Sequence, residues 1–337
     1  MMKEKVVLSS RVRLARNYQD LPFDAAQKPE DAAKCISRTT GALAASALTE
    51  QFTLHRLGEM SGENRRALAE SRLISRDLLR VPETAAVFIR DDKPLSVMMN
   101  EEDHLRIQAI RPGLDLQTAA QDCFEVDDAL SRQAAFAFDA QLGYLTACPT
   151  NTGTGMRASL LLHLPMLTAG KQMGNVGQLA AKVGLNIRGV YGEGAEALGH
   201  IYQISNQVTL GRTEQELINT VTAVGGKLCD MEEALRLKAL GDGRAALEDQ
   251  VFRAWAILRH ARILTAAEFY QQWSALRLGV ALEMLPLSLE AADALLDQAQ
   301  TAHLCIYAGE TLEGAALDIC RANRMRELLA HAQDPLL

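Results

Sequence analysis

The segment 148–159, CPTNTGTGMRAS, constrains this chain more than any other, because it sets a cysteine before a Gly/Thr-rich turn and an arginine directly behind it. Gly153 and Gly155 allow backbone N–H groups to approach an anion closely. The spacing differs from that of a Walker A loop, which needs a terminal lysine, and from that of a Rossmann fingerprint. The segment therefore predicts an anion-binding turn of another kind, although a buried structural cysteine is the ordinary interpretation of Cys148 by itself.

Three more segments carry arginine and glutamate where a partner for such a turn is needed: 9–13 (SSRVR), 100–106 (NEEDHLR) and 188–194 (RGVYGEG). In an extended strand, Arg11 and Arg13 project from the same face, and two adjacent guanidiniums match the oxygens of a phosphate. Arg16 either joins them or lies on the surface. Taken alone, each segment also fits an ordinary structure: a solvated strand end, a surface salt-bridge cluster or a glycine-rich connection.

The segment 100–106 predicts the reaction centre. If it is extended, Glu102, His104 and Arg106 share one face, so that Glu102 can hold a cationic acceptor and take its proton while Arg106 faces phosphate. Cys148 beside such cations is expected to have a lowered thiol pKa and to exist as a thiolate. In the 188–194 segment we expect a further phosphate-binding arginine and a second carboxylate for the acceptor, on a glycine-rich loop that closes over substrate.

Composition argues against several functions. The chain has 337 residues and a formal net charge of −7, which disfavours a nucleic-acid-binding protein. Its six cysteines form no C-x-x-C pair, so we expect a reducing compartment, no disulfide framework and no zinc site. No apolar run approaches the length of a membrane span, and the N-terminus lacks the apolar stretch of a signal peptide. A cytoplasmic protein without membrane contact is therefore expected.

Apolar periodicity predicts an α+β arrangement followed by helices. Helices are expected at 28–50, 61–80, 116–140 and 171–183, and strands at 6–13, 84–89, 95–99, 160–164 and 201–209. Capping boxes at 213–216 and 265–268 predict the first turns of two further helices. Strand-like patterns nearly vanish after about residue 230, so we expect a catalytic domain over residues 1–230 and an all-helical domain over residues 231–337.

Taken together, the four segments resemble the phosphagen (guanidino) kinase superfamily in their order and internal spacing: S-x-R-x-R, N-E-E-D-H-L-R, C-P-T-N-x-G-T-x-x-R and R-G-x-x-G-E. The runs 8–17 and 191–211 are most similar to its bacterial protein-arginine kinase branch. The resemblance is strong over residues 6–230 and weak beyond them. It implies a catalytic domain built on a mostly antiparallel sheet flanked by helices, with a C-terminal all-helical domain.

The resemblance also implies roles by motif position. The ATP phosphates would be bound by Ser9, Arg11, Arg13, Arg106, Arg157 and Arg188. Glu102 would be the catalytic carboxylate, Glu193 a second carboxylate on a mobile loop, and Cys148 the active-site cysteine. The implied cofactors are ATP and Mg²⁺, with the metal carried by ATP and not by protein side chains.

Two positions depart from the pattern of the family. Arg72 stands where the family tends to place a nucleotide-contacting histidine, so the adenine-side contact is expected to fall to this arginine. In the C-terminal part, relatives often carry R-D-x-x-R-A, a pocket for phosphoarginine. Here Asp318 and Arg321 remain, while Leu317 replaces the first arginine, so a weakened regulatory pocket is expected.

The implied reaction is ATP-dependent phosphorylation of arginine side chains in proteins, which would mark them for Clp-type degradation in stress and quality control. The implied partners are protein substrates with exposed arginine, a zinc-binding activator protein and a Clp-type unfoldase; a homodimer is left open. Two alternatives stay open as well. One is a small-molecule arginine kinase, and the other is a non-catalytic adaptor that binds arginine or phosphoarginine.

Overall fold

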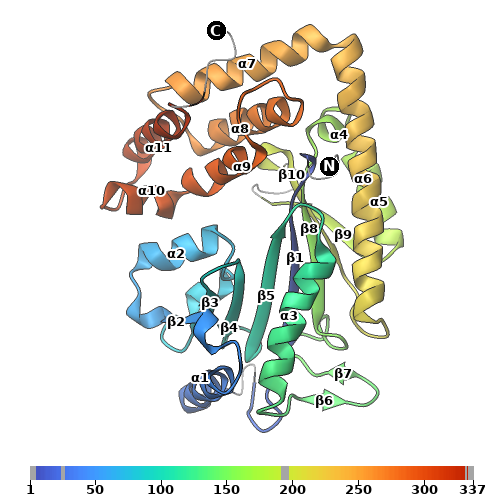
Figure 1. Cartoon of the computed structure of the whole chain (residues 1–337), viewed down its shortest axis with the longest axis vertical. Coiled ribbons are helices and arrows are strands. Elements are labelled where there is room, and N and C mark those ends of the chain that lie inside the picture. The colour runs from blue at the N-terminus through green and yellow to red at the C-terminus, as the bar shows by residue number, and fades with distance from the viewer. Residues whose placement is uncertain (1–4, 24–26, 191–196, 331, 333–337) are drawn as a thin grey trace.

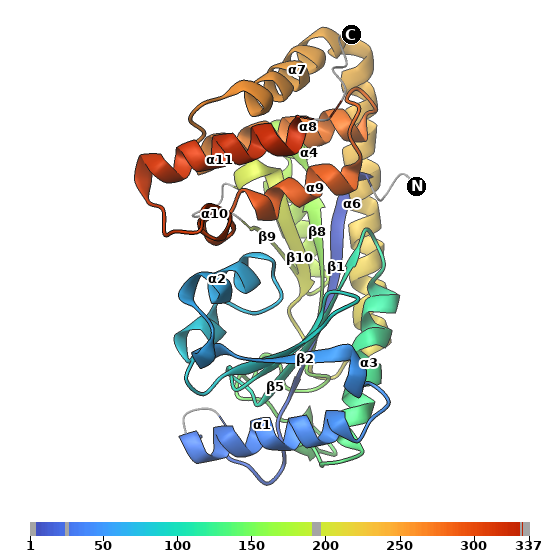
Figure 2. The same ribbon diagram turned by 60° about the vertical axis from the view of Figure 1, so that its left-hand side comes forward.

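The structure is a computed structural model, and it describes residues 5–23, 27–190, 197–330 and 332. A sheet with its covering helices forms one part of the molecule, and a stack of helices sits at one end of that sheet (Figures 1 and 2). None of the helices in the described ranges is both long and apolar enough to cross a membrane.

Eight strands within the described residues form one sheet in the order β2-β3-β4-β5-β1-β8-β10-β9, and every neighbouring pair is antiparallel. Their bounds are β1 Val7–Arg16, β2 Phe52–Arg56, β3 Ala86–Arg90, β4 Leu95–Met99, β5 Leu105–Pro112, β8 Met156–His163, β9 Leu185–Gly189 and β10 Ile201–Asn206. A separate short hairpin consists of β6 (Phe138–Asp139) and β7 (Gly143–Tyr144). The expected antiparallel sheet is confirmed.

The central strand β1 shows why the sheet has two different faces. Val12 and Leu14 are fully buried in the main core, where they join residues of α3 (Leu116–Ser131) and α6 (Glu214–Asp242). Arg11 and Arg13 alternate with them and therefore point to the other face. The other helices of this part are α1 Pro29–Ala44, α2 Gly62–Glu70, α4 Pro165–Ala169 and α5 Met173–Lys182. One face is thus packed by helices, while the other is free to carry a site.

The remaining helices, α7 to α11, make up what we call the helical part. Their bounds are α7 Arg244–His260, α8 Ala266–Ala281, α9 Leu289–Gln298, α10 Thr301–Ala308 and α11 Gly314–Leu329. They enclose a second core around Trp255, Phe269 and Trp273, which also takes in Leu8 and Leu161 of the sheet. Helix α6 runs unbroken through residue 230 to the helical part, so the expected domain boundary at that position stays a prediction.

Most expected elements are present, but three helices end six or more residues before the predicted position. The capping box of Thr213 and Glu216 is confirmed at the start of α6, and Thr265 caps α8. The predicted helix 28–50 ends at residue 44, 61–80 at residue 70 and 116–140 at residue 131. In the last case, the backbone of residues 135–137 pairs with residues 17–19 after β1 instead. Tertiary hydrogen bonds therefore override a local helical pattern.

Candidate active site

The strand face opposite α3 carries a cleft of about 390 Å³. Six residues that the sequence singled out line it together: Ser9, Arg11, Arg13, Arg72, Arg106 and Arg188. They come from β1, β5, β9 and the turn after α2, which are far apart along the chain. The sheet therefore brings the predicted phosphate-binding residues into one place.

Strand register explains how the arginines meet. Arg13 on β1 lies directly opposite Arg157 on β8. Arg11 donates from Nη2 to Oε1 of Gln203 on β10 at 3.0 Å, and Gln203 in turn lies opposite Arg188 on β9. Gln203 also lines the cleft, and nothing in the sequence motifs pointed to it. Neighbouring antiparallel strands thus present guanidiniums side by side across the sheet.

These arginines strongly affect one another. Burial, followed by the charges of Arg72, Arg106, Arg188 and Arg157, lowers the pKa of Arg11 to about 10. Burial and the charge of Arg11 place the pKa of Arg13 well below its ordinary value. Guanidiniums remain protonated at neutral pH all the same, so the cluster holds several unneutralised positive charges at close range. Such a cluster is suited to bind a polyanion.

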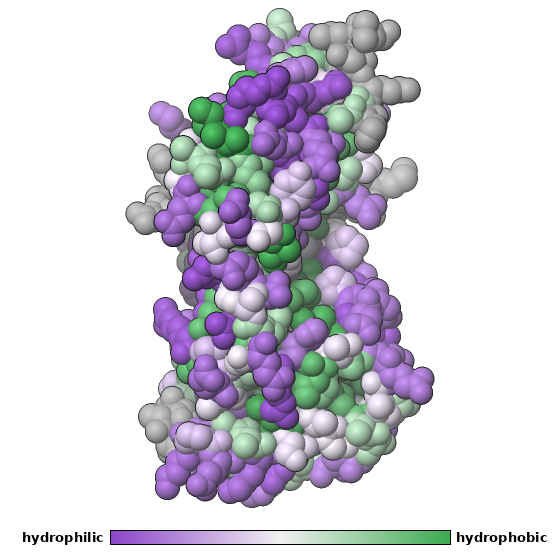
Figure 3. Space-filling view, turned by 90° about the vertical axis from the view of Figure 1, so that its left-hand side faces the viewer, coloured by the Kyte–Doolittle hydropathy of each residue, from purple (hydrophilic) through white to green (hydrophobic). Residues whose placement is uncertain are grey.

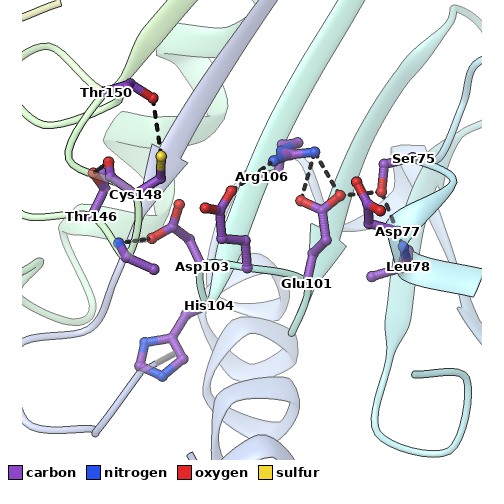
Figure 4. A network of polar contacts seen from close by, with 12 residues as sticks. Ser75, Asp77, Leu78, Glu101, Asp103, His104, Arg106, Thr146, Cys148 and Thr150 are labelled. Carbon is purple, nitrogen blue, oxygen red and sulfur yellow. Dashed lines mark hydrogen bonds and ion pairs between the residues drawn. The ribbon is translucent and has the colours of Figure 1, made fainter. Parts of the chain in front are cut away.

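Arg106 is held in this cluster by Glu101. The two side chains form an ion pair at 2.6 Å, in which the Glu101 side chain is only 3% exposed. Ser75 also donates a hydrogen bond to the Glu101 carboxylate (Figure 4). Glu101 was not among the expected site residues, although it belongs to the same N-E-E-D-H-L-R run as Glu102. It fixes the direction of the Arg106 side chain.

Glu102 and Cys148 lie next to each other, because their neighbours in sequence are hydrogen-bonded. Oδ1 of Asp103 accepts from the backbone N–H of Ala147 at 2.7 Å (Figure 4). It also accepts from Nδ2 of Asn17 at 2.7 Å. Burial and the neighbouring carboxylates of Asp103 and Glu101 raise the pKa of Glu102, whereas Arg106 and a hydrogen bond with Cys148 lower it. The net shift is upward, which makes Glu102 a stronger base than an ordinary glutamate.

His104 does not share a face with Glu102 and Arg106, so that expectation is wrong. The backbone bends at residues 100–104, with φ of 62° at Asn100, and β5 begins only at Leu105. The His104 ring is buried: Nδ1 accepts from the N–H of Tyr18 at 3.1 Å, and Nε2 lies 3.1 Å from the carbonyl of Pro22. His104 therefore supports the loop, whereas Oε2 of Glu102 lies 3.8 Å from Nη2 of Arg106, which lines the cleft.

Arg16 is a structural residue and does not join the cluster. It is 1% exposed, pairs with Asp127 at 2.9 Å and stacks over the ring of Tyr144 with its guanidinium carbon 3.5 Å from the ring centroid.

Glu193 lies outside the described residues. Cys148 is half-buried and lies 3.0 Å from the hydroxyl of Thr150.

The predicted phosphoarginine residues lie in the helical part, on α11, and do not line the cleft. Arg321 is 2% exposed; its Nη1 donates to Asp318 at 2.6 Å and to the carbonyl of Leu264 at 2.8 Å, and its Nε donates to the carbonyl of Ala299 at 3.0 Å. The guanidinium thus joins α11 to two neighbouring segments of the helical part.

Two family models match this chain. The model of the ATP:guanido phosphotransferase C-terminal catalytic domain matches residues 34–235, and that of the protein-arginine kinase McsB C-terminal domain matches residues 244–336. A protein-arginine kinase of Caldanaerobacter subterraneus subsp. tengcongensis is 42% identical over 319 residues, covering 94% of this chain and 95% of the relative. A protein-arginine kinase of Moorella thermoacetica is 43% identical over 329 residues, covering 96% and 94%.

Solved structures show the same fold. The duplicated taurocyamine kinase of Schistosoma mansoni with bound transition-state analogue components aligns with a TM-score of 0.62 and 28% identity, over 73% of this chain and 36% of the duplicated one. A lombricine kinase aligns with a TM-score of 0.61 and 26% identity, over 70% of this chain and 68% of its own.

Proposed function

The chain belongs to the protein-arginine kinases of the ATP:guanido phosphotransferase family, and we propose that it transfers the γ-phosphoryl group of ATP to arginine side chains of proteins. The observation that carries this proposal is the cluster of cleft arginines on neighbouring strands, with the carboxylate of Glu102 3.8 Å from Arg106 and hydrogen-bonded to Cys148. The cleft arginines suit a polyanion, and the carboxylate of Glu102 beside Arg106 suits a cationic acceptor.

The arginine cluster is the ATP-binding half of the site. The cleft is lined by Ser9, Arg11, Arg13, Arg106 and Arg188, and Arg157 lies opposite Arg13. The guanidiniums repel one another, and bound ATP phosphates would attract all of them. Mg²⁺ would enter with ATP and neutralise part of the phosphate charge. Arg72 lines the same cleft and is the proposed adenine-side contact.

Glu102 is the proposed catalytic base. An arginine side chain is a poor nucleophile while protonated, because its pKa lies above about 12. Glu102 would hold this cation and take one proton as the new N–P bond forms and the bond from the γ-phosphorus to the bridging oxygen breaks, which leaves ADP. Its raised pKa favours that transfer. We assign Cys148 to hold the acceptor beside Glu102, and Glu193 as the second carboxylate.

Compartment, substrates and partners follow from the proposed activity. We place the protein in the cytoplasm, where its six free cysteines would stay reduced. The proposed substrates are proteins with exposed arginine, which would be marked for a Clp-type unfoldase. A zinc-binding activator, a homodimer and regulation by phosphoarginine at Asp318 and Arg321 are proposed on family resemblance alone.

The deciding experiment supplies Mg-ATP with either free arginine or an unfolded arginine-containing protein. Products are analysed by mass spectrometry under conditions that spare the acid-labile N–P bond. Phosphoarginine on the protein but not on free arginine is the expected result. Phosphorylation of free arginine instead would indicate a small-molecule kinase, and ATP binding without any product, even after activator is added, would indicate an adaptor.

A further inference from the structure

One wall of the proposed ATP cleft comes from the helical part. Gln300, between α9 and α10, lines the cleft together with Ala69, Glu70 and Arg72 at the end of α2. The two segments meet where the molecule narrows between its upper and lower parts (Figure 3). They are joined by hydrogen bonds between Glu70 and Ala302, which are 232 residues apart in the chain. The cleft therefore contains a contact between the sheet and the helical part.

Glu70 caps helix α10 from outside that helix. Its carboxylate accepts from the backbone N–H of Ala302 at 2.9 and 3.1 Å and from that of His303 at 3.2 Å. Nδ1 of His303 lies 2.9 Å from the same carboxylate, and Nε2 lies 3.1 Å from the hydroxyl of Ser71. Gln300 occupies the N-cap position of α10 but makes no side-chain cap bond. Glu70 thus satisfies the free donors of this helix and interacts favourably with its dipole.

Arg72 follows Glu70 and Ser71 in the chain and lines the cleft. Its φ of 62° lies in the left-handed region, which is uncommon for a residue with a side chain. Its carbonyl accepts from Nε2 of Gln108 at 2.7 Å, while its own Nε is buried without a hydrogen-bond partner in the described structure. Its charge lowers the pKa of both Arg11 in the cluster and Asp297 in α9, although burial raises the latter overall. Arg72 thus lies between the two parts.

We propose that Glu70 is a positioning residue for the nucleotide: by capping α10, it holds the helical part against the cleft and fixes Arg72 and Gln300 in the cleft wall. This inference rests on the proposed function, because it assumes that ATP occupies the cleft. Docking of α10 and nucleotide binding are then linked in both directions, so that loosening the contact weakens ATP binding. Loosening the contact does not directly alter the phosphoryl-transfer step, in which Glu102 is the proposed base.

Calorimetric titration with ADP and ATP tests this coupling independently of activity. We expect Glu70→Ala to weaken nucleotide binding about fivefold to tenfold, in line with the loss of a helix cap, and to leave kcat at saturating ATP within about twofold. His303→Ala removes the side-chain partner of Glu70 in the helical part, leaves the backbone donors of Ala302 and His303 in place and does not alter the cleft lining, so it is expected to weaken binding less than Glu70→Ala does. The double variant should lose less than the sum of both.

Controls separate this coupling from other effects. Glu59→Gln, at an exposed glutamate near α2, should leave affinity unchanged. Glu70→Gln keeps one acceptor oxygen and should recover part of the affinity; it also provides a folded variant should Glu70→Ala unfold. Weaker binding in Glu70→Ala without faster amide hydrogen exchange at Ala302 and His303 would mean that Glu70 touches the nucleotide itself, which overturns the positioning role. Unchanged affinity in Glu70→Ala overturns it as well, whereas a wild-type protein that binds no nucleotide contradicts the proposed function.

Discussion

The carboxylate of Asp103 accepts a hydrogen bond from the backbone N–H of Ala147 at 2.7 Å, and this bond joins the two loops that carry Glu102 and Cys148. Asp103 is 4% exposed and also binds Asn17. We expect Asp103→Ala to lower kcat at least about tenfold, because a small displacement of Glu102 from the acceptor strongly lowers the rate of the chemical step. It should also destabilise the fold by about 1–3 kcal/mol, since buried donors lose their acceptor.

Chemical denaturation and steady-state kinetics of the same Asp103→Ala preparation test this prediction. Asp128→Ala, at an exposed aspartate on α3, is the matched control and should behave as wild type. Wild-type turnover in Asp103→Ala would show that the bond does not position the reacting groups.

Glu102→Gln should remove most of the turnover while ATP still binds. The substitution keeps the shape of the side chain but removes the base, and general base catalysis contributes about 10² to 10⁴ in rate. Rapid-quench measurement of phosphoarginine, together with ATP titration, separates the two effects. Glu125→Gln, at an exposed glutamate of α3, is the control. Turnover within a few-fold of wild type in Glu102→Gln would rule out the assigned role.

The pH dependence of kcat/KM should report Glu102 in the free enzyme. This group acts as a base, so activity is present above its pKa and is lost as pH falls through that value. Because burial and nearby carboxylates raise this pKa, the acid limb should have its midpoint above the ordinary glutamate value of about 4.3. Initial rates across a pH series, after a check that the protein stays folded, provide the measurement. A midpoint at or below that value would contradict the assignment.

Arg13→Met should weaken ATP binding but not the ligand-free fold. Loss of a charge-assisted hydrogen bond to phosphate corresponds to about 1.5–3 kcal/mol, or at least about tenfold in affinity. Folding lowers the pKa of Arg13, so the folded state disfavours its charged form at every pH below the ordinary arginine value. Methionine removes that unfavourable effect.

Thermal unfolding with and without ATP measures both consequences of Arg13→Met. The ligand-free Tm is expected to stay equal or rise, while the ATP-induced increase in Tm shrinks. Arg132→Met, at an exposed position after α3, is the control for losing a positive charge. A marked fall in the ligand-free Tm of Arg13→Met alone would mean that this arginine stabilises the fold, against the electrostatics described above.

Local patterns predicted those features that neighbouring residues control. Arg11 and Arg13 share a face because strand side chains alternate with a period of two, and both line the cleft. The capping box at Thr213 needs only residues within one helical turn. The order of the four motifs likewise predicted the antiparallel fold by resemblance, which the solved structures of related kinases confirm.

Contacts between distant segments decided the rest. The spacing of Glu102, His104 and Arg106 suggested one strand face, yet the bend at Asn100 turned His104 towards Tyr18. Arg16 has the same side-chain chemistry as the cleft arginines, and only its burial against Asp127 separates it from them.

By itself, the sequence determined the alternation of strands, the caps of helices and the residue types available to a phosphate site, because these depend on interactions over a few positions. Only the tertiary structure decided which carboxylate holds Arg106, where the helix after Gly62 ends, and that Glu70 caps α10. The physical reason is that a hydrogen bond or an ion pair forms wherever packing brings its partners together. That packing is set by the hydrophobic cores, and no local pattern around Glu70 specifies a partner 232 residues away.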